Sequence, residues 1–252
     1  MTTCKTGAEH IKSLKDGRTV YIDGKLVDDV TEHPAFRNAV KSAAMLYDFQ
    51  AKPENIELMT FVPNGSNRRV NRSWQMPRNY GEMVQRRKAM QAWAALSYGF
   101  MGRSPDHLAS ALVGQRMGIE VFEKHGAERA NAVRDYFEEA SRNDYFLTYV
   151  IINPQAERAK DWGEQKEELV ARIVDEDSGG ITIRGAKMLG TSLDHGQRGF
   201  RRQPATVKAR RRRPRVLLRA AHERQGHARA LAQVLRGGGR VHFRQSDLVT
   251  LR

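Results

Sequence analysis

The sequence predicts an α+β fold: a mostly helical N-terminal domain over residues 1–145, an incomplete β-domain over 146–192, and a basic tail over 193–252. Between residues 80 and 141, apolar side chains recur every three or four positions, as they do on one face of an α-helix. From residue 146 the run FLTYVII is rich in β-branched and aromatic residues, which favour strands. After residue 192 the composition becomes rich in arginine.

The first 79 residues contain short predicted elements. A helix is expected over Thr6–Leu14, followed by a hairpin over 19–27 that turns at Asp23-Gly24, a pair suited to a tight turn with positive φ. A helix after Pro34 has one apolar stripe, and MTFV at 59–62 predicts a short strand. The stripe consists of Phe36, Val40, Ala44 and Tyr47.

Three longer helices are expected next, at about 80–98, 105–124 and 128–141, and their packing is expected to form the core of the N-terminal half. The strand at 146–152 stops at Asn153-Pro154. Segments 169–174 and 181–189 flank the acidic stretch DEDSGG, which predicts a hairpin with a loose acidic turn. Two or three strands rarely hold together alone, so further strands are expected.

Composition excludes several classes of protein. The single cysteine, Cys4, excludes an internal disulfide and any site built from several thiolates, and no metal site is expected. The polar N-terminus has no apolar stretch like that of a signal peptide, and the longest apolar run, 92–101, is too short to cross a bilayer. We therefore expect a cytoplasmic location.

The net charge of +14 belongs almost wholly to the tail. Residues 1–192 hold 27 Lys and Arg against 26 Asp and Glu, whereas residues 193–252 hold 16 against 3. Three interpretations compete: a disordered arm that binds nucleic acid, a basic helix that docks on an acidic partner, and residues translated in the wrong frame.

The wrong-frame hypothesis explains the largest part of the tail's composition. The tail has fifteen Arg to one Lys and no Tyr or Trp, as a GC-rich gene gives when it is read out of frame. Back-translated and advanced by one nucleotide, residues 193–203 and 216–227 both permit ordinary protein sequence. We therefore expect a frameshift just after Ser192, which would truncate a longer protein.

Four strings in the first 192 residues together resemble one family: SLKDGRTVY from Ser13, GRSPDH from Gly102, LTYVIINPQ from Leu147 and GAKMLGT from Gly185. In this order and spacing they are similar to the oxygenase component of the 4-hydroxyphenylacetate 3-monooxygenase family. Members of this family are two-component phenol hydroxylases. The resemblance covers nearly all of residues 1–192 and none of the tail.

The resemblance implies an activity and an architecture. A separate NAD(P)H-flavin reductase supplies FADH2, and the oxygenase uses it with O2 to hydroxylate a phenol ortho to its hydroxyl. The implied fold is acyl-CoA dehydrogenase-like: a helical domain, a β-barrel, and a helical bundle that builds a homotetramer. This chain would hold the first domain and the opening of the second, so little or no activity is expected from it.

The resemblance also implies substrate-binding residues, at Arg103, Ser104, Pro105, Asp106, His107 and Tyr149, with Arg103, His107 and Tyr149 catalytic. Arg103 corresponds to the substrate-loop arginine. His107 stands where typical members carry tyrosine, and Tyr149 where they carry histidine. The alternatives are that Arg103 is solvated, that Ser104-Pro105 simply begins a helix, that His107 faces outward, and that Tyr149 is a buried strand residue.

For the cofactor, FAD, the resemblance implies contacts at Tyr149, Val150, Ile151, Gln155, Ala156, Glu157, Arg158 and Thr191. A plain turn after Asn153-Pro154 is the alternative for Gln155–Arg158. The sequence has no Rossmann fingerprint or P-loop, which is consistent with a flavin bound across domains.

The sequence leaves two other function classes to compare with a phenol hydroxylase. Hydroxyacyl-CoA dehydratases share this fold family but need several thiolates for an iron-sulfur cluster, and only Cys4 is present. A nucleic-acid-binding protein acting through the Arg-rich tail is the second alternative, and it would bind with steep salt dependence.

Overall fold

The computed structural model describes residues 3–150, 152, 171–177, 180–188, 190–192, 196, 198–202, 217–221 and 250–251. The helices are α1 (Gly7–Ser13), α2 (Arg37–Ala51), α3 (Ile56–Met59), α4 (Tyr80–Leu96), α5 (Pro105–Met117), α6 (Glu120–Glu123) and α7 (Ala127–Arg142), with a 3₁₀ turn η1 (Arg72–Trp74). None of the described helices is long and apolar enough to span a membrane. The part of the chain before residue 146 is therefore mostly helical, as predicted.

The strands form small sheets. β1 (Val20–Ile22) pairs antiparallel with β2 (Lys25–Val27) and parallel with β10 (Thr250–Leu251), and β3 (Thr60–Phe61) pairs with β4 (Val70–Asn71). β5 (Leu147–Val150) lies parallel to β8 (Arg198–Arg202), which pairs antiparallel with β9 (Leu217–Ala221). β6 (Arg172–Asp177) and β7 (Gly180–Arg184) form a hairpin. Three of these strands, β8, β9 and β10, lie within the basic tail.

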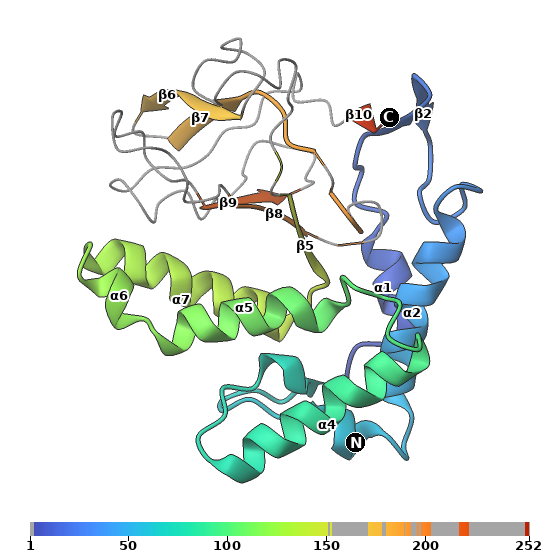
Figure 1. Cartoon of the computed structure of the whole chain (residues 1–252), viewed down its shortest axis with the longest axis vertical. Helices are drawn as coiled ribbons and strands as arrows, with labels where there is room; N and C mark the ends of the chain where they lie inside the picture. Colours follow the sequence, from blue (N-terminus) through green and yellow to red (C-terminus); the bar gives the residue numbers. More distant parts are fainter. Residues whose placement is uncertain are drawn as a thin grey trace.

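The main core lies where α5, α7 and the start of β5 meet η1 and β4. Figure 1 shows α5 and α7 side by side, with β5 rising from them toward β8 and β9. The buried residues come from four elements and the strand that follows α7: Val70, Trp74, Leu108, Ala109, Leu112, Val113, Val133, Tyr136, Phe137, Ala140 and Leu147. Full burial of a large apolar side chain such as Leu112 or Phe137 stabilises the fold by about 1.5–3 kcal/mol, and this shared core holds α5 and β5 together.

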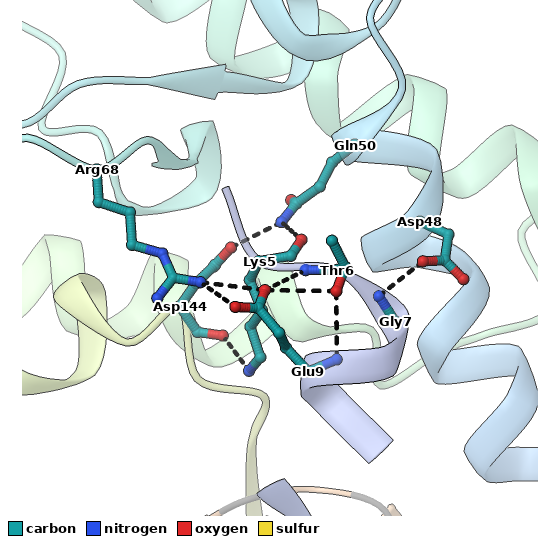
Figure 2. Close-up of polar contacts among 8 residues, drawn as sticks. All are labelled: Lys5, Thr6, Gly7, Glu9, Asp48, Gln50, Arg68 and Asp144. Carbon is teal, nitrogen blue, oxygen red and sulfur yellow. Dashed lines mark hydrogen bonds and ion pairs between the residues drawn. The ribbon is translucent and has the colours of Figure 1, made fainter. Parts of the chain in front are cut away.

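A second structural centre joins the N-terminal segment to the start of β5. Asp144, between α7 and β5, is 3% exposed and adopts the left-handed conformation with φ 46°. Its carboxylate accepts hydrogen bonds from Gln50 Nε2 at 2.9 Å and Trp74 Nε1 at 2.9 Å. Its carbonyl oxygen accepts from Lys5 Nζ at 2.8 Å (Figure 2). One residue thus connects α2, η1 and the chain before α1.

Several predicted boundaries needed correction. The helix expected over 105–124 ends at Met117, because Gly118 forms the C-cap and the chain restarts as the short α6. Met59 belongs to α3, so the strand expected at 59–62 is only β3. In the hairpin, Asp175–Asp177 lie in β6 and not in the turn. Their period-2 pairing with β7 outweighs the turn preference of an acidic stretch.

Candidate active site

The N-terminus of α5 carries the first group of predicted site residues. Ser104 is the N-cap in an extended conformation, φ −65° and ψ 162°, and Pro105 occupies the first turn. Proline suits this position because its missing N–H would lack a partner there anyway and its φ is already helical. Pro105 and Leu108 are buried, so the first turn of α5 is held against the core. Arg103, just before the helix, and His107, in its first turn, therefore lie at a helix end whose position is fixed.

A half-buried arginine on α4, Arg86, reinforces this helix end. Arg86 Nη2 donates to the Ser73 carbonyl oxygen at 3.0 Å and to Ser110 Oγ at 2.7 Å. Ser110 in turn donates to the carbonyl oxygen of Asp106 at 2.6 Å. Burial lowers the pKa of Arg86 from its ordinary value, but arginine stays charged in proteins. The arrangement ties α4, η1 and the first turn of α5 together.

The three residues predicted to be catalytic contact one another. They are Arg103, His107 and Tyr149. The Arg103 guanidinium carbon lies 4.4 Å from the centre of the Tyr149 ring. The His107 and Tyr149 rings are stacked, with centroids 5.4 Å apart and an interplanar angle of 22°. Arg103 Nη1 and His107 Nε2 are 3.4 Å apart. A cation on an aromatic face gains about 0.5–2 kcal/mol, so the cluster has a defined geometry without a ligand.

The structural alternatives given for these residues from the sequence agree with the structure for some residues and not for others. His107 is exposed, as the alternative for it expects, yet its ring stacks on Tyr149. Tyr149 is half-buried and packs against the main core. Arg103 is half-buried on the Tyr149 ring, which differs from a fully solvated loop residue. The side chain of Ser104 makes no capping hydrogen bond, although the residue does begin the helix.

Only some of the residues expected to contact flavin belong to the part of the chain that the structure describes. Tyr149, Val150 and Thr191 are described, whereas Ile151, Gln155, Ala156, Glu157 and Arg158 lie outside the described residues. Thr148 Oγ1 donates a hydrogen bond to the carbonyl oxygen of Thr191. Two segments more than forty residues apart in sequence are therefore joined beside Tyr149.

A second contact joins the same two segments. Met188 N donates to the Ile152 carbonyl oxygen at 2.8 Å, and the two residues form an antiparallel bridge. Both side chains are exposed, Ile152 at 39% and Met188 at 42%, and Thr191 is exposed as well. Apolar side chains beside exposed polar groups suit a ring system with a flat apolar face and hydrogen-bonding edges. These residues fit a flavin.

The electrostatics of the Asp144 centre bear on how firmly β5 is held. Burial raises the pKa of the Asp144 carboxyl and lowers the pKa of Lys5 to about 7, while the attraction between the two groups opposes both shifts. Lys5 Nζ also lies 4.5 Å from the centre of the Tyr47 ring, and burial raises the pKa of Tyr47 well above its ordinary value. Asp144 lies five positions before Tyr149, so this centre fixes the start of the strand that carries it.

Sequence reasoning missed the groups that support the site. Asp144 follows a predicted helix and precedes an apolar strand, which marks a helix end but gives no signal that donors from Lys5, Gln50 and Trp74 converge there. Thr148 lies between two residues of the recognised string, but its bond to Thr191 depends on the pairing of distant segments. The sequence shows only a polar residue just before the predicted strand at 146–152, and the burial of that residue is a finding of the structure.

Comparison with known proteins shows which family the chain belongs to. Residues 6–194 match the family described as 4-hydroxyphenylacetate 3-hydroxylase N terminal. The chain is 37% identical over 190 residues to the 4-hydroxyphenylacetate 3-monooxygenase oxygenase component of Geobacillus sp., covering 74% of this chain and 38% of that protein. It is 39% identical over 186 residues to the pyoverdin chromophore biosynthetic protein PvcC of Pseudomonas aeruginosa, covering 74% and 36%. The chain thus spans little more than a third of the length of these curated relatives.

Solved structures agree with the sequence matches. A crystal structure of the oxygenase component of 4-hydroxyphenylacetate 3-monooxygenase with FAD and 4-hydroxyphenylacetate superposes with a TM-score of 0.78 at 28% identity, covering 88% of this chain and 46% of that one. An archaeal 4-hydroxybutyryl-CoA dehydratase shares the fold, with a TM-score of 0.72 at 20% identity over 86% and 43% of the two chains. This chain belongs to the family of 4-hydroxyphenylacetate 3-hydroxylases, whose N-terminal region it matches.

Proposed function

We propose that the chain is the N-terminal part of the oxygenase component of a two-component monooxygenase, which hydroxylates a phenol such as 4-hydroxyphenylacetate ortho to its hydroxyl with FADH2 and O2. The observation that carries the proposal is the mutual contact of Arg103, His107 and Tyr149. Relatives named as 4-hydroxyphenylacetate and 4-nitrophenol monooxygenase components support it. The substrates in the names of both relatives are phenols.

Arg103 has the chemistry that this reaction needs. A free phenol has a pKa of about 10, and a guanidinium close to its oxygen can lower that value by about 1–3 units. The phenolate is richer in electrons at the ortho carbon than the neutral phenol. We assign to Arg103 the binding of this oxygen, with His107 and Tyr149 completing one wall of the site together with Ser104, Pro105 and Asp106.

FAD is the cofactor in this proposal. When bound, FADH2 supplies the electrons with which O2 is activated. Tyr149, Val150 and Thr191 would contact it, beside the exposed Ile152 and Met188, and the exposed Thr191 hydroxyl would be available to a polar edge. Ile151 and the segment Gln155–Arg158, outside the described residues, remain predictions as flavin contacts.

The remaining architecture is also part of the proposal. We propose a helical domain over 1–145, the opening of a β-barrel over 146–192, and a non-native tail from 193. A separate flavin reductase would supply FADH2, the complete oxygenase would form a homotetramer, and the cytoplasmic location expected from the sequence stays a prediction. Support for incompleteness comes from the relatives, of which the chain covers 35–39%.

The phenol site can be tested without flavin. 4-Nitrophenol changes its visible absorption when it ionises, so its spectrum reports the pKa of the bound phenol. The 252-residue chain is expected to lower that pKa, and Arg103→Met is expected to abolish the shift. Arg87→Met, which removes an exposed arginine of α4, serves as the matched control and should behave like the unchanged chain. An equal shift with Arg103→Met would contradict the assignment of Arg103.

Turnover tests the completeness of the chain. We expect little or no hydroxylation of 4-hydroxyphenylacetate when the 252 residues are mixed with NADH, FAD and a flavin reductase, because they match only 38% of the length of the Geobacillus relative. Product would be measured by chromatography against a complete relative under the same conditions. A rate equal to that of the relative would overturn the proposed incompleteness and leave the phenol site in place.

A further inference from the structure

The ring of Tyr149 contacts both other members of the proposed site. The Arg103 guanidinium lies over the ring at 4.4 Å, and the His107 imidazole stacks with it at 5.4 Å. Both contacts use the ring system and neither needs the Tyr149 hydroxyl. The strand on either side of Tyr149 is fixed, because Thr148 and Val150 are buried. The ring of Tyr149 is therefore fixed in place, and it contacts two side chains from the N-terminal end of α5.

The contact between Arg103 and His107 has a defined direction. Arg103 Nη1 lies 3.4 Å from His107 Nε2. Arginine has only donors, so a hydrogen bond between these atoms requires His107 Nε2 to accept. In a neutral imidazole the other nitrogen then carries the proton, because the partner of one ring nitrogen sets the state of the other. A hydrogen bond between Arg103 Nη1 and His107 Nε2 therefore favours the neutral tautomer of His107 with hydrogen on Nδ1.

We propose that Tyr149 is a positioning residue that acts through its ring: it holds Arg103 against His107, so that His107 presents its Nδ1–H to the ligand. The identity of that ligand rests on the proposed function. The site then offers guanidinium N–H groups together with an imidazole N–H, and both are donors. Hydrogen-bond donors of this kind favour an oxygen anion such as a phenolate over a neutral phenol.

The tautomer of His107 provides a direct test in the unliganded chain. Long-range nitrogen–proton NMR spectra distinguish the two neutral tautomers of a histidine ring, and comparison with His107→Gln assigns the signal. The spectra would be recorded at about pH 8.5, roughly two units above the ordinary pKa of histidine. The unchanged chain is expected to show hydrogen on Nδ1 of His107. Hydrogen on Nε2 would overturn the proposal.

Substitutions at Tyr149 separate the ring from the hydroxyl. Tyr149→Phe keeps the ring and is expected to retain the Nδ1–H tautomer, whereas Tyr149→Leu is expected to shift His107 to a mixture of tautomers. Arg103→Met should give the same mixture, because it removes the donor without touching the core. Retention of the tautomer in Tyr149→Leu or Arg103→Met, or its loss in Tyr149→Phe, would contradict the proposal.

Tyr145→Leu is the matched control. Tyr145 packs against the same core cluster, and its hydroxyl lies 3.3 Å from Glu139 Oε1. This variant makes the same chemical change four residues earlier and should keep the wild-type tautomer. If Tyr149→Leu does not fold, the Tyr149→Phe and Arg103→Met spectra still decide the outcome. The 4-nitrophenol spectrum is a separate measurement, so a failed phenol site and a failed positioning role give different results.

Discussion

Asp144 accepts hydrogen bonds from donors in several separate segments of the chain. Its side chain accepts from Gln50 and Trp74, and its backbone oxygen accepts from Lys5 at 2.8 Å and from the Tyr47 hydroxyl at 3.2 Å. An aspartate tolerates the left-handed φ of 46° that the chain needs between α7 and β5 better than most residues do. One residue thus meets both a conformational and a hydrogen-bonding requirement.

Removing the Asp144 carboxylate is expected to destabilise the chain strongly. Asp144→Ala removes an acceptor from the buried donors of Gln50 and Trp74, and it removes the larger of the two attractions that favour the charged form of the buried Lys5. We expect a loss of about 3–5 kcal/mol in the free energy of unfolding, measured by urea denaturation. Asp135→Ala, which removes an exposed aspartate of α7, should change stability by less than about 0.5 kcal/mol. Similar losses for the two variants would contradict this role.

Lys5 predicts how stability depends on pH. Burial lowers its pKa to about 7 in the folded chain, against an ordinary value of 10.5. Between these two values the unfolded chain binds more protons, so this residue makes the folded state more stable as the pH rises. Wild-type stability should therefore increase relative to Lys5→Met between about pH 7 and pH 9, by up to about 1.4 kcal/mol per pH unit.

The comparison of wild type with Lys5→Met contains its own control. Below about pH 7, Lys5 is protonated in both the folded and the unfolded chain, so the two stability curves should run parallel there. Urea denaturation at half-unit intervals from pH 5.5 to pH 9 measures both ranges. Parallel curves across the whole range would show that Lys5 does not titrate in this window.

At the scale of elements, α1 and α2 approach closely at Gly7. Gly7 N donates to Asp48 Oδ1 at 2.8 Å (Figure 2). A Cβ placed on Gly7 would lie 2.5 Å from Asp48 Oδ2 and 2.6 Å from the Ala44 carbonyl oxygen. The start of α1 is also fixed by a capping box, in which Thr6 and Glu9 bond each other's backbone N–H. A side chain at position 7 would force the two helices apart.

Gly7→Ala is therefore expected to destabilise the chain, although alanine is the better helix former. We expect a loss of about 1–3 kcal/mol from the overlap with α2. Gly114→Ala is the matched control, because Gly114 lies in α5 and a Cβ there would meet nothing within 4 Å. That variant should gain about 0.5–1 kcal/mol. Thermal or urea unfolding measures both, and changes of the same sign would contradict the predicted crowding at Gly7.

Elements with a strong local signal were predictable from the sequence. The stripe of Phe36, Val40, Ala44 and Tyr47 is buried on α2, and Asp23-Gly24 turns the first hairpin with φ of 50° and 76°. The break at Gly118 was missed because the apolar period continues across it to Ile119 and Phe122, which both pack on the core. A periodic pattern gives the buried face of a helix more reliably than its end.

The site was predictable only in part, for the same reason. Arg103 and His107 are one helical turn apart, so their proximity follows from local spacing. Tyr149 joins them through the packing of β5 on α5, and that packing depends on contacts between residues distant in sequence. The residues that hold β5, such as Lys5 and Asp144, are separated by 139 positions, and no periodic signal connects them.

At the scale of the whole molecule, sequence similarity stops close to the predicted boundary. The family match ends at residue 194, two positions beyond the proposed frameshift after Ser192. The Geobacillus relative is matched over 38% of its length. The charge balance changes at the same place, from 27 basic against 26 acidic residues before it to 16 against 3 after it. Composition and similarity change together.

We therefore expect the gene, read one nucleotide further after the codon for Ser192, to continue as a recognisable member of the family. The translated sequence should extend the alignment with the Geobacillus protein and lose the excess of Arg over Lys. A DNA read across the codons for Thr191 to Leu193 provides the measurement. The same one-nucleotide shift applied before residue 192 is the control, and it should yield no sequence similar to the family. Early stop codons in the shifted frame after Ser192 would contradict the frameshift and leave the Arg-rich segment as a selected part of the protein.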